Sequence, residues 1–441
     1  MANLVQAEST QDETNLPVPV GARMGPFSLT MAWWAVCSAI FYIVVGASLA
    51  MSYGAKNAII GMALSVVTYG IINNIISRYA IKEGLSVALF SRRLFGRIGA
   101  SLATLIFFST AIYYAVFEGS VIAVAINATF PWLDYHWAAL FVVIYSVLLV
   151  FGSVQTWLDK FNGVLLPFYI LGLIATVVAS INVYGYQADW INLGAENATP
   201  QGWWNCFTYY MGVWILMLFT FDYARFGKQE DSNYHARVNF GMPFYLLTFL
   251  INGIVSIYLV ASIPQDAALS EVSVVLSILK LLGIWGLLFV WITQTRINTA
   301  NFYLASVNMQ SFFSELLNIK AVKFFWSCIV GGIVYLLMLV DVFSYLLQAL
   351  AYQGVFVVAW VGIALAHILV NNSEEANSLI ESDNRFNKVG LSAWLISTIV
   401  GIVMMNSGAS IASFSAPITF VVSFFVYAGI KNSEGKELSR V

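Results

Sequence analysis

The stretch at residues 112–126, IYYAVFEGSVIAVAI, carries one carboxylate inside an otherwise apolar run. Glu118 follows Tyr114 by four residues, so on a helix the two side chains share a face, with Phe117 beside them. A charged side chain at the centre of a membrane helix costs about 2.5–3.5 kcal/mol on insertion scales. An acid kept at that cost next to aromatic rings suits a planar polar ligand, such as a heterocyclic base. The structural alternative is a glutamate bonded to a neighbour for packing.

A second group of polar residues lies in the segment WITQTRINTANFYLASVN, residues 291–308. Amides recur there at helical spacing, with two hydroxyls alongside: Gln294, Asn298 and Asn301, then Thr295 and Thr299. Such a face must look at a cavity or at other helices rather than at lipid. The amides can bind a base edge, and the hydroxyl and amide oxygens can coordinate Na⁺. Hydrogen bonding between helices is the alternative.

Arg296 lies in the same segment and has three open roles. Its guanidinium can neutralise Glu118, take the place of a bound cation, or reach along its aliphatic stem to the membrane surface.

Two further segments show signs of interruption. Small residues, including Ala35, Cys37 and Ser38, separate the large apolar ones in 27–52, and close helix packing alone explains them. In transporters with inverted repeats, however, helices broken near the midplane present free backbone groups to a ligand or ion. Gly212 followed by Trp214 predicts a similar break with an aromatic lid. Asp222 and Arg225, three residues apart, are expected to pair as a structural clasp.

The composition of the chain predicts the kind of helices that hold these residues. The chain has 441 residues, of which 60% are hydrophobic and 10% charged, against about 25% charged in soluble domains. Recurrent apolar segments of roughly 20 residues predict an all-α polytopic membrane protein in a lipid bilayer. We expect twelve transmembrane helices, at 27–52, 57–79, 99–126, 137–154, 162–184, 205–224, 239–262, 281–306, 322–340, 343–370, 390–406 and 410–430.

Basic residues predict the orientation of the chain in the membrane. Arginine and lysine gather in alternate short loops, beginning with the loop after 57–79, and almost none lies in the opposite loops. The positive-inside rule then places both termini in the cytoplasm, and we expect the inner membrane of a bacterium. Residues 1–20 lack the apolar core of a cleavable signal peptide. No basic run indicates nucleic acid as a partner.

Several motifs together resemble the nucleobase:cation symporter-1 family, which includes cytosine, purine, allantoin and hydantoin permeases. FDYARFGKQED, after the segment 205–224, is similar to the family's D-F-x-R-[YF]-x-[KR] element, with Tyr223 in place of Phe. Residues 114–118 resemble its W-[FY]-G-x-Q pattern, with Tyr114 for Trp and Glu118 for Gln. Asn298, Asn301 and Tyr303 resemble its N-x-x-N-x-Y element.

The resemblance implies a leucine-transporter-like fold, a 5+5 inverted repeat followed by two C-terminal helices. The expected divisions are a cytoplasmic N-terminal tail at 1–26, a first repeat at 27–184, a second repeat at 205–370, two helices within 390–430, and a cytoplasmic tail at 431–441.

The resemblance also implies the site. A base would stack between Tyr114 and Trp214, near Phe117, Gly212 and Ser38, and hydrogen-bond to Glu118 and to Asn298 or Asn301. The family's sodium site would fall near Ala35, Ser38, Thr295 and Thr299. Two departures bear on it: Glu118 adds a titratable group, and Arg296 adds a fixed charge near the ion.

The sequence therefore predicts a secondary transporter that imports a nucleobase or related heterocycle by alternating access. An acid in an apolar site is biased towards its neutral form, so Glu118 can carry a proton, and H⁺ is favoured over Na⁺ as the co-transported cation. No other cofactor is expected. The alternatives are a same-fold transporter of amino acids or amines, or a non-transporting membrane sensor. An enzyme is not expected, since the histidines stand apart from cysteines and from one another. The particular base and the oligomeric state stay open.

Overall fold

The computed structural model describes residues 17–150, 154–264, 269–270, 272–340, 343–370 and 385–438. Within these ranges the regular secondary structure is helical, apart from one isolated bridge between Met24 and Gly227. Six helices are long and apolar enough to cross a membrane, or seven when one bent pair is counted as a single span. The protein is thus an all-α polytopic membrane protein, and the total of twelve spans stays a prediction.

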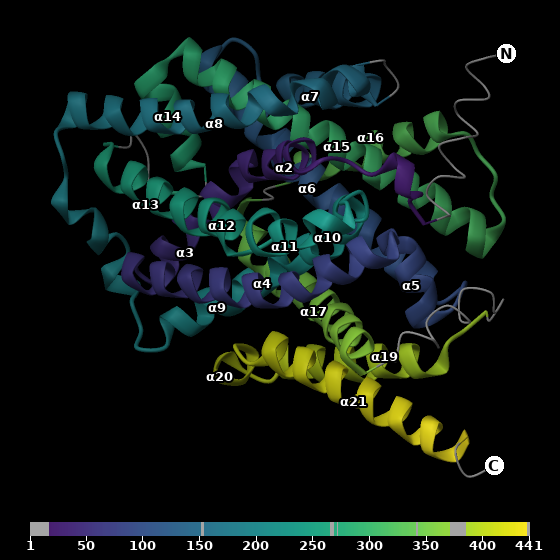
Figure 1. Cartoon of the computed structure of the whole chain (residues 1–441). Coiled ribbons are helices and arrows are strands. Elements are labelled where there is room, and N and C mark those ends of the chain that lie inside the picture. The colour runs from purple at the N-terminus through teal and green to yellow at the C-terminus, as the bar shows by residue number, and fades with distance from the viewer. Residues whose placement is uncertain are drawn as a thin grey trace, which may run out of the picture.

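The first half of the chain begins with a helix in three pieces and continues through long helices (Figure 1). Such helices satisfy their own backbone hydrogen bonds, which lipid cannot do for them. The elements are η1 (Val20–Ala22), α2 (Pro26–Trp34), η2 (Ala35–Ser38), α3 (Ile40–Tyr53), α4 (Ala55–Glu83), α5 (Val87–Phe95), α6 (Ala100–Thr129), α7 (Tyr135–Leu149) and α8 (Val154–Tyr184).

The second half contains more interrupted helices than the first. Its elements are η3 (Ala188–Asn192), η4 (Ala195–Asn197), α9 (Gly202–Met211), η5 (Gly212–Trp214), α10 (Ile215–Ala224), η6 (Gln229–Asp231), α11 (Ser232–Tyr234), η7 (His235–Asn239), α12 (Met242–Tyr245), η8 (Leu246–Ile251), α13 (Asn252–Ser262), α14 (Ser273–Leu282), α15 (Ile284–Leu317), α16 (Lys323–Met338), η9 (Phe343–Tyr345), α17 (Leu346–Val370), α19 (Lys388–Met405), α20 (Ala409–Ala412) and α21 (Ser415–Leu438).

Every predicted span overlaps a helix or an interrupted helix, but one helix was not expected. α5 lies in the basic loop after α4 and is capped by Ser86, whose hydroxyl accepts the Leu89 N–H at 3.2 Å. Phe90 and Leu94 of α5 are fully buried. Arg93 is also buried and pairs with Glu83 at 3.0 Å, so the buried side of this helix contains a charge as well as apolar residues. The sequence did not predict α5 because its residues do not form a continuous apolar run.

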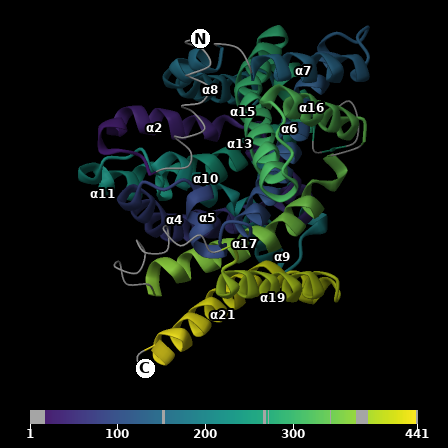
Figure 2. The same ribbon diagram turned by 90° about the vertical axis from the view of Figure 1, so that its right-hand side faces the viewer.

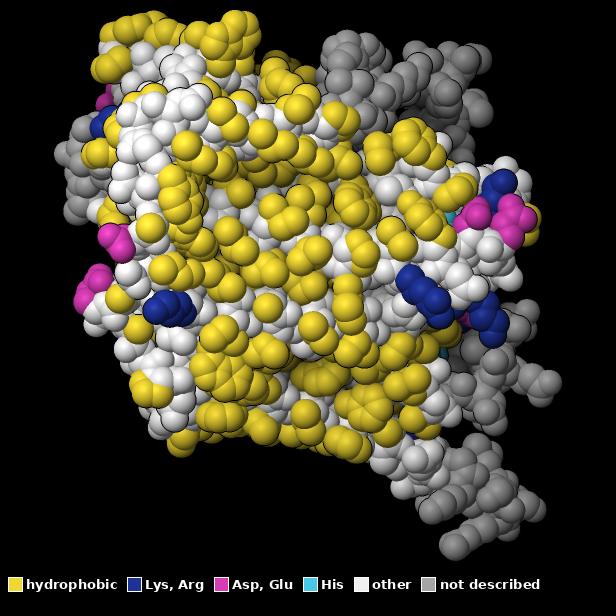
Figure 3. Space-filling view, turned by 60° about the vertical axis from the view of Figure 1, so that its left-hand side comes forward, with side chains coloured by type: hydrophobic (Ala, Val, Ile, Leu, Met, Phe, Trp, Pro, Cys, Tyr) yellow, Lys and Arg dark blue, Asp and Glu magenta, His cyan; other side chains and the backbone are white. Residues whose placement is uncertain are grey.

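Helices α6 and α15 pack against each other along much of their length in the middle of the molecule (Figures 1 and 2). α19 and α21 form an outer layer on α17, at the lower edge of Figure 1. Figure 3 shows a broad face covered by hydrophobic side chains, with charged groups at its margins. α8 illustrates such an outward stripe, since Leu171, Ile174 and Val178 are about half exposed or more. This surface suits contact with lipid tails.

The first helix is broken in its middle, where small residues interrupt the apolar ones. η2 ends at Ser38, Ala39 is extended (φ −63°, ψ 121°), and α3 starts at Ile40. The axes of the two halves differ by 43°. Several backbone groups at this break lose their usual partner within the helix, so other elements must supply one.

Candidate functional site

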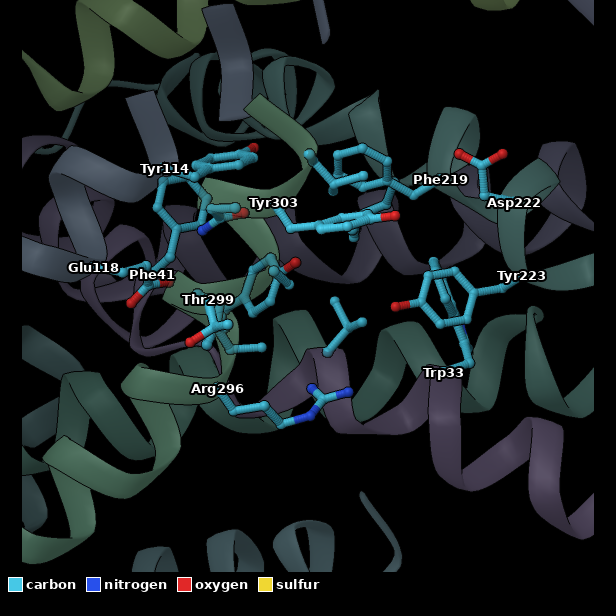
Figure 4. Close-up of a pocket in the computed structure, with 18 residues that line it drawn as sticks. Trp33, Phe41, Tyr114, Glu118, Phe219, Asp222, Tyr223, Arg296, Thr299 and Tyr303 are labelled. Atoms are coloured by element: carbon cyan, nitrogen blue, oxygen red, sulfur yellow. The ribbon is translucent and has the colours of Figure 1, made fainter. Parts of the chain in front are cut away.

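A cavity of about 270 Å³ lies beside the break in the first helix (Figure 4). Its walls come from α2, η2, α3, α6, α10 and α15, and the volume suits a small molecule. Glu118 and Tyr114 line one end, whereas Trp33, Asp222 and Tyr223 line the other. The extended backbone at Ala39, also in the lining, brings α3 against α6 at the first end.

Glu118 is the acid at the centre of the molecule, 1% exposed on α6. Its carboxylate accepts a hydrogen bond from the backbone N–H of Phe41, in the first turn of α3. The N-terminus of a helix offers free N–H groups and a partial positive charge, so the break supplies a natural partner for a carboxyl oxygen. Oε2 has no hydrogen-bond partner among the described residues. One oxygen of Glu118 is therefore held by the protein, whereas the other keeps its full hydrogen-bonding capacity.

Aromatic rings close the cavity at the Glu118 end. Tyr114 lines the cavity and packs edge-on against Phe41, with ring centroids 4.9 Å apart. Phe117 does not line it but lies behind, at 5.2 Å from both Phe41 and Phe343. The amide of Gln353 in α17 donates to the Tyr114 hydroxyl at 3.3 Å. These contacts hold the Tyr114 ring in place at the cavity wall.

The two candidate asparagines of α15 have different surroundings. Asn301 lines the cavity, and its Nδ2 has no hydrogen-bond partner among the described residues. Asn298 is fully buried away from the cavity lining, and its Nδ2 donates to the Ser146 hydroxyl of α7 at 3.1 Å. Each of the two keeps one polar atom without a partner among the described residues, Nδ2 in Asn301 and Oδ1 in Asn298. A buried polar atom without a partner costs free energy unless something binds it, and only Asn301 of the two lines the cavity, so Asn301 is the stronger candidate for ligand contact.

Trp214 does not lie in the cavity. Its ring packs against Tyr69 of α4 and Phe420 of α21, at centroid distances of 6.0 and 5.2 Å. The cavity face of α10 instead presents Phe219 and Tyr223, which the sequence motifs did not mark as stacking residues. Successive residues of a helix turn by about 100°, so an aromatic two positions before Leu216 of the lining points almost the opposite way.

Gly212 acts in packing rather than in the lining. A Cβ at this position would lie 2.3 Å from the backbone oxygen of Leu350 in α17, so only glycine allows these helices to come so close. Its carbonyl accepts the amide of Gln353 at 3.0 Å. Around the residue, η5 continues between α9 and α10 with helical dihedral angles.

The expected clasp between Asp222 and Arg225 takes another form. Arg225 donates from Nε to the backbone oxygen of Asp222 at 3.3 Å, and its guanidinium lies 4.8 Å from the Phe226 ring centroid. The Asp222 carboxylate lines the cavity and accepts the backbone N–H of Val87, the first residue of α5. This motif therefore joins the end of α10 to the unexpected helix α5.

The residues predicted for cation coupling are only partly brought together. Arg296 and Thr299 line the cavity, one turn apart on α15. The Thr295 hydroxyl pairs with Tyr145 of α7 at 3.0 Å. The Ser38 hydroxyl donates to the carbonyl of Ala35 at 2.8 Å, within η2.

Several solved structures of transporters share the architecture of this chain. The inward-facing conformation of Mhp1 matches with a TM-score of 0.76 and 14% identity, covering 96% of this chain and 93% of that one. The chain has the fold of Mhp1. A closed conformation of Mhp1, a nucleobase-cation-symport-1 family transporter, with bromovinylhydantoin bound, matches with a TM-score of 0.72 and 15% identity over 96% of both chains.

A more distant likeness is to a manganese transporter of Eremococcus coleocola, with a TM-score of 0.53 and 12% identity over 94% of this chain and 95% of that one. No protein-family model and no curated protein matches the sequence. The expected leucine-transporter-like fold is confirmed, and the neighbours are transporters rather than enzymes.

Proposed function

We propose that the protein belongs to the nucleobase:cation symporter-1 family and imports a nucleobase-type heterocycle together with a cation, with H⁺ favoured over Na⁺. The observation that carries the proposal is the pair of unsatisfied polar atoms near one cavity, Oε2 of Glu118 and Nδ2 of Asn301. Glu118 and Asn301 line the same cavity, so a small ligand bound there contacts both residues.

The binding mode follows from the chemistry of the walls. A planar heterocycle stacks on Tyr114, and edge groups meet the Glu118 carboxyl and the Asn301 amide. A protonated carboxyl group donates one hydrogen bond and accepts others, whereas an amide nitrogen only donates. Ligands with N–H donors next to ring nitrogens or carbonyls fit this pattern, as in guanine, adenine, cytosine or a cationic heterocycle.

Proton coupling is assigned to Glu118 because it is the buried acid at the ligand end of the cavity. The titratable groups that face it are the hydroxyls of Tyr42, Tyr114 and Tyr169, and Arg296 lines the same cavity. An acid in an apolar site favours the neutral form, so a proton taken from the outer side can travel with the substrate.

The position of the cavity indicates the direction in which it opens. The cavity end at Asp222 lies on the side of the basic loops, which the positive-inside rule assigns to the cytoplasm of a bacterial cell. On the opposite side, Phe117 and Phe343 pack together and Gln353 bridges α6 and η5. We infer an inward-facing state, in which the repeats at 27–184 and 205–370 have closed the outer path. The interrupted first helix of each half supports these repeats.

Two other cargoes fit less well. A manganese ion needs several oxygen or nitrogen ligands around one point. Among the described residues, no cluster of three histidine, cysteine or acidic side chains could hold a metal. An amino acid or amine would use the carboxylate of Glu118 but leave the aromatic wall and Asn301 without a partner of matching shape.

Two measurements test the function. A thermal-shift screen of the purified protein should show stabilisation by one or more nucleobases and none by amino acids or amines. In proteoliposomes, an inward pH gradient should then drive accumulation of the stabilising base. Stabilisation by amino acids alone would refute the substrate class. Accumulation driven by a sodium gradient alone would refute proton coupling.

A further inference from the structure

The break in the first helix has its own protein partners at the place where a sodium ion would bind. In transporters with broken helices, unwound carbonyls coordinate the coupling ion. By resemblance, that ion would sit between the carbonyls near Ala35 and Ser38 and the hydroxyls of Thr295 and Thr299. The hydrogen-bond partners of these carbonyls and hydroxyls decide whether the site suits a cation.

One side-chain amide spans the break. Gln294 of α15 is fully buried, and its Oε1 accepts the backbone N–H of Ile40 at 3.0 Å. Its Nε2 donates to the backbone oxygen of Ser38 at 3.2 Å and to the Thr293 hydroxyl at 2.7 Å. A single amide thus satisfies both a donor and an acceptor that the extended residue Ala39 removes from the helix.

A second amide binds the preceding carbonyl. Asn252, the first residue of α13, donates from Nδ2 to the backbone oxygen of Cys37 at 3.0 Å. Its own Oδ1 accepts the Tyr169 hydroxyl of α8 at 3.0 Å, and both side chains are fully buried. Two consecutive carbonyls of the break, at Cys37 and Ser38, therefore face N–H donors from two different helices.

This environment is unfavourable for Na⁺. A cation binds oxygen lone pairs, whereas an amide hydrogen directed at the same oxygen carries a partial positive charge. Arg296 adds a full charge close by: it lines the cavity together with Thr299 and acts electrostatically on the Cys37 thiol. Repulsion between like charges grows as the surroundings exclude water. The residues present do not fit a sodium ion.

We propose that Gln294 and Asn252 close the break in the first helix in place of a sodium ion, so that the protein does not bind Na⁺ there. The consequence, uptake that needs no Na⁺, rests on the proposed transport function, but the occupation of the break by amides does not. α15 then holds the first helix through hydrogen bonds of the Gln294 amide rather than through an ion that arrives and leaves.

The experiment is a thermal melt of the purified full-length protein in NaCl and in KCl across a concentration series at equal ionic strength. A ligand that binds only the folded state raises the melting temperature in a concentration-dependent way. The two salt series should coincide. A saturable rise in NaCl alone would overturn the proposal. No base and no gradient enters this measurement, so a failure of the proposed function leaves its result intact.

A matched pair of variants tests the role of the amide. Gln294→Ala removes the bridge, and Gln310→Ala removes one ordinary hydrogen bond, to the Ala321 backbone, from the same helix. Gln294→Ala should lower the melting temperature at least twice as far as Gln310→Ala in either salt. Equal effects would contradict the proposal. If Gln294→Ala does not fold, the salt comparison on the unaltered protein still decides.

Discussion

The two interrupted helices that open the two halves of the chain differ in kind. The first has an extended residue, Ala39, and a 43° bend, whereas the second passes through η5 with helical angles throughout. In both, a glutamine from another helix binds a backbone oxygen near the interruption, Gln294 at Ser38 and Gln353 at Gly212. Only the first interruption exposes an N-terminus to a cavity acid, Glu118.

This difference separates ligand chemistry from packing. The break at Ala39 frees the N–H of Phe41, which holds Glu118, so we assign binding and coupling to it. The glycine at 212 lets two helices approach closely, and Gln353 beside it holds the Tyr114 hydroxyl. Changes at the first site should alter transport, and changes at the second should mainly alter stability.

The largest effect is expected for Glu118→Gln. The amide cannot take up a transportable proton but keeps hydrogen-bonding atoms, so accumulation driven by a pH gradient should disappear while some binding of base persists. Uptake into proteoliposomes and thermal shift with the base measure the two effects. Unchanged pH-driven accumulation would remove Glu118 from the coupling mechanism.

The next largest effect is expected at Gly212, where two helices pack closely. Gly212→Val should greatly reduce the yield of folded protein, because a Cβ would meet the Leu350 backbone oxygen at 2.3 Å. Overpacking of this kind typically costs about 1–3 kcal/mol, and a backbone atom has little freedom to move aside. Size-exclusion chromatography measures the folded fraction. Gly332→Val, where a Cβ meets nothing within 4 Å, is the control and should express normally.

A moderate effect should distinguish Phe219 from Trp214, two aromatic residues of the second interrupted helix. Phe219→Leu removes a ring from the cavity wall and should weaken binding of the base by about 3–10-fold, the equivalent of roughly 0.5–1.5 kcal/mol of aromatic contact. Trp214→Phe should change the Kd less than about twofold, since that ring packs on Tyr69 and Phe420. Titration calorimetry or thermal shift gives both values. The reverse order would restore Trp214 as the stacking residue.

The smallest effect is expected for Gln353→Ala. The variant loses one hydrogen bond to the Tyr114 hydroxyl and one to the Gly212 carbonyl, each contributing about 0.5–1.5 kcal/mol. The melting temperature should fall by a few degrees while proton coupling persists. If pH-driven uptake fails as completely as in Glu118→Gln, then the Gly212 region takes part in coupling and the division between the two regions is wrong.

Much of the architecture could be predicted from the sequence, because membrane helices need long apolar runs whatever surrounds them. The burial of Glu118 on one face with Tyr114 follows from the same local rule, as does the inward face of Asn298 and Asn301. Sequence motifs also led to the fold that the structural neighbours confirm. The helix α5 escaped prediction because its apolar face is only partly repeated and lies among arginines.

Tertiary structure alone decided which polar groups meet. Helical spacing places Gln294 and Asn301 on one stripe, but it does not say that Gln294 reaches across to Ser38 and Ile40 while Asn301 faces a cavity. Likewise, the type of residue suggests a stacking role for Trp214, and only the rotation of its helix turns it towards α21. The reason is physical: hydropathy and periodicity are local properties, whereas a hydrogen bond across 256 residues depends on how separate helices pack.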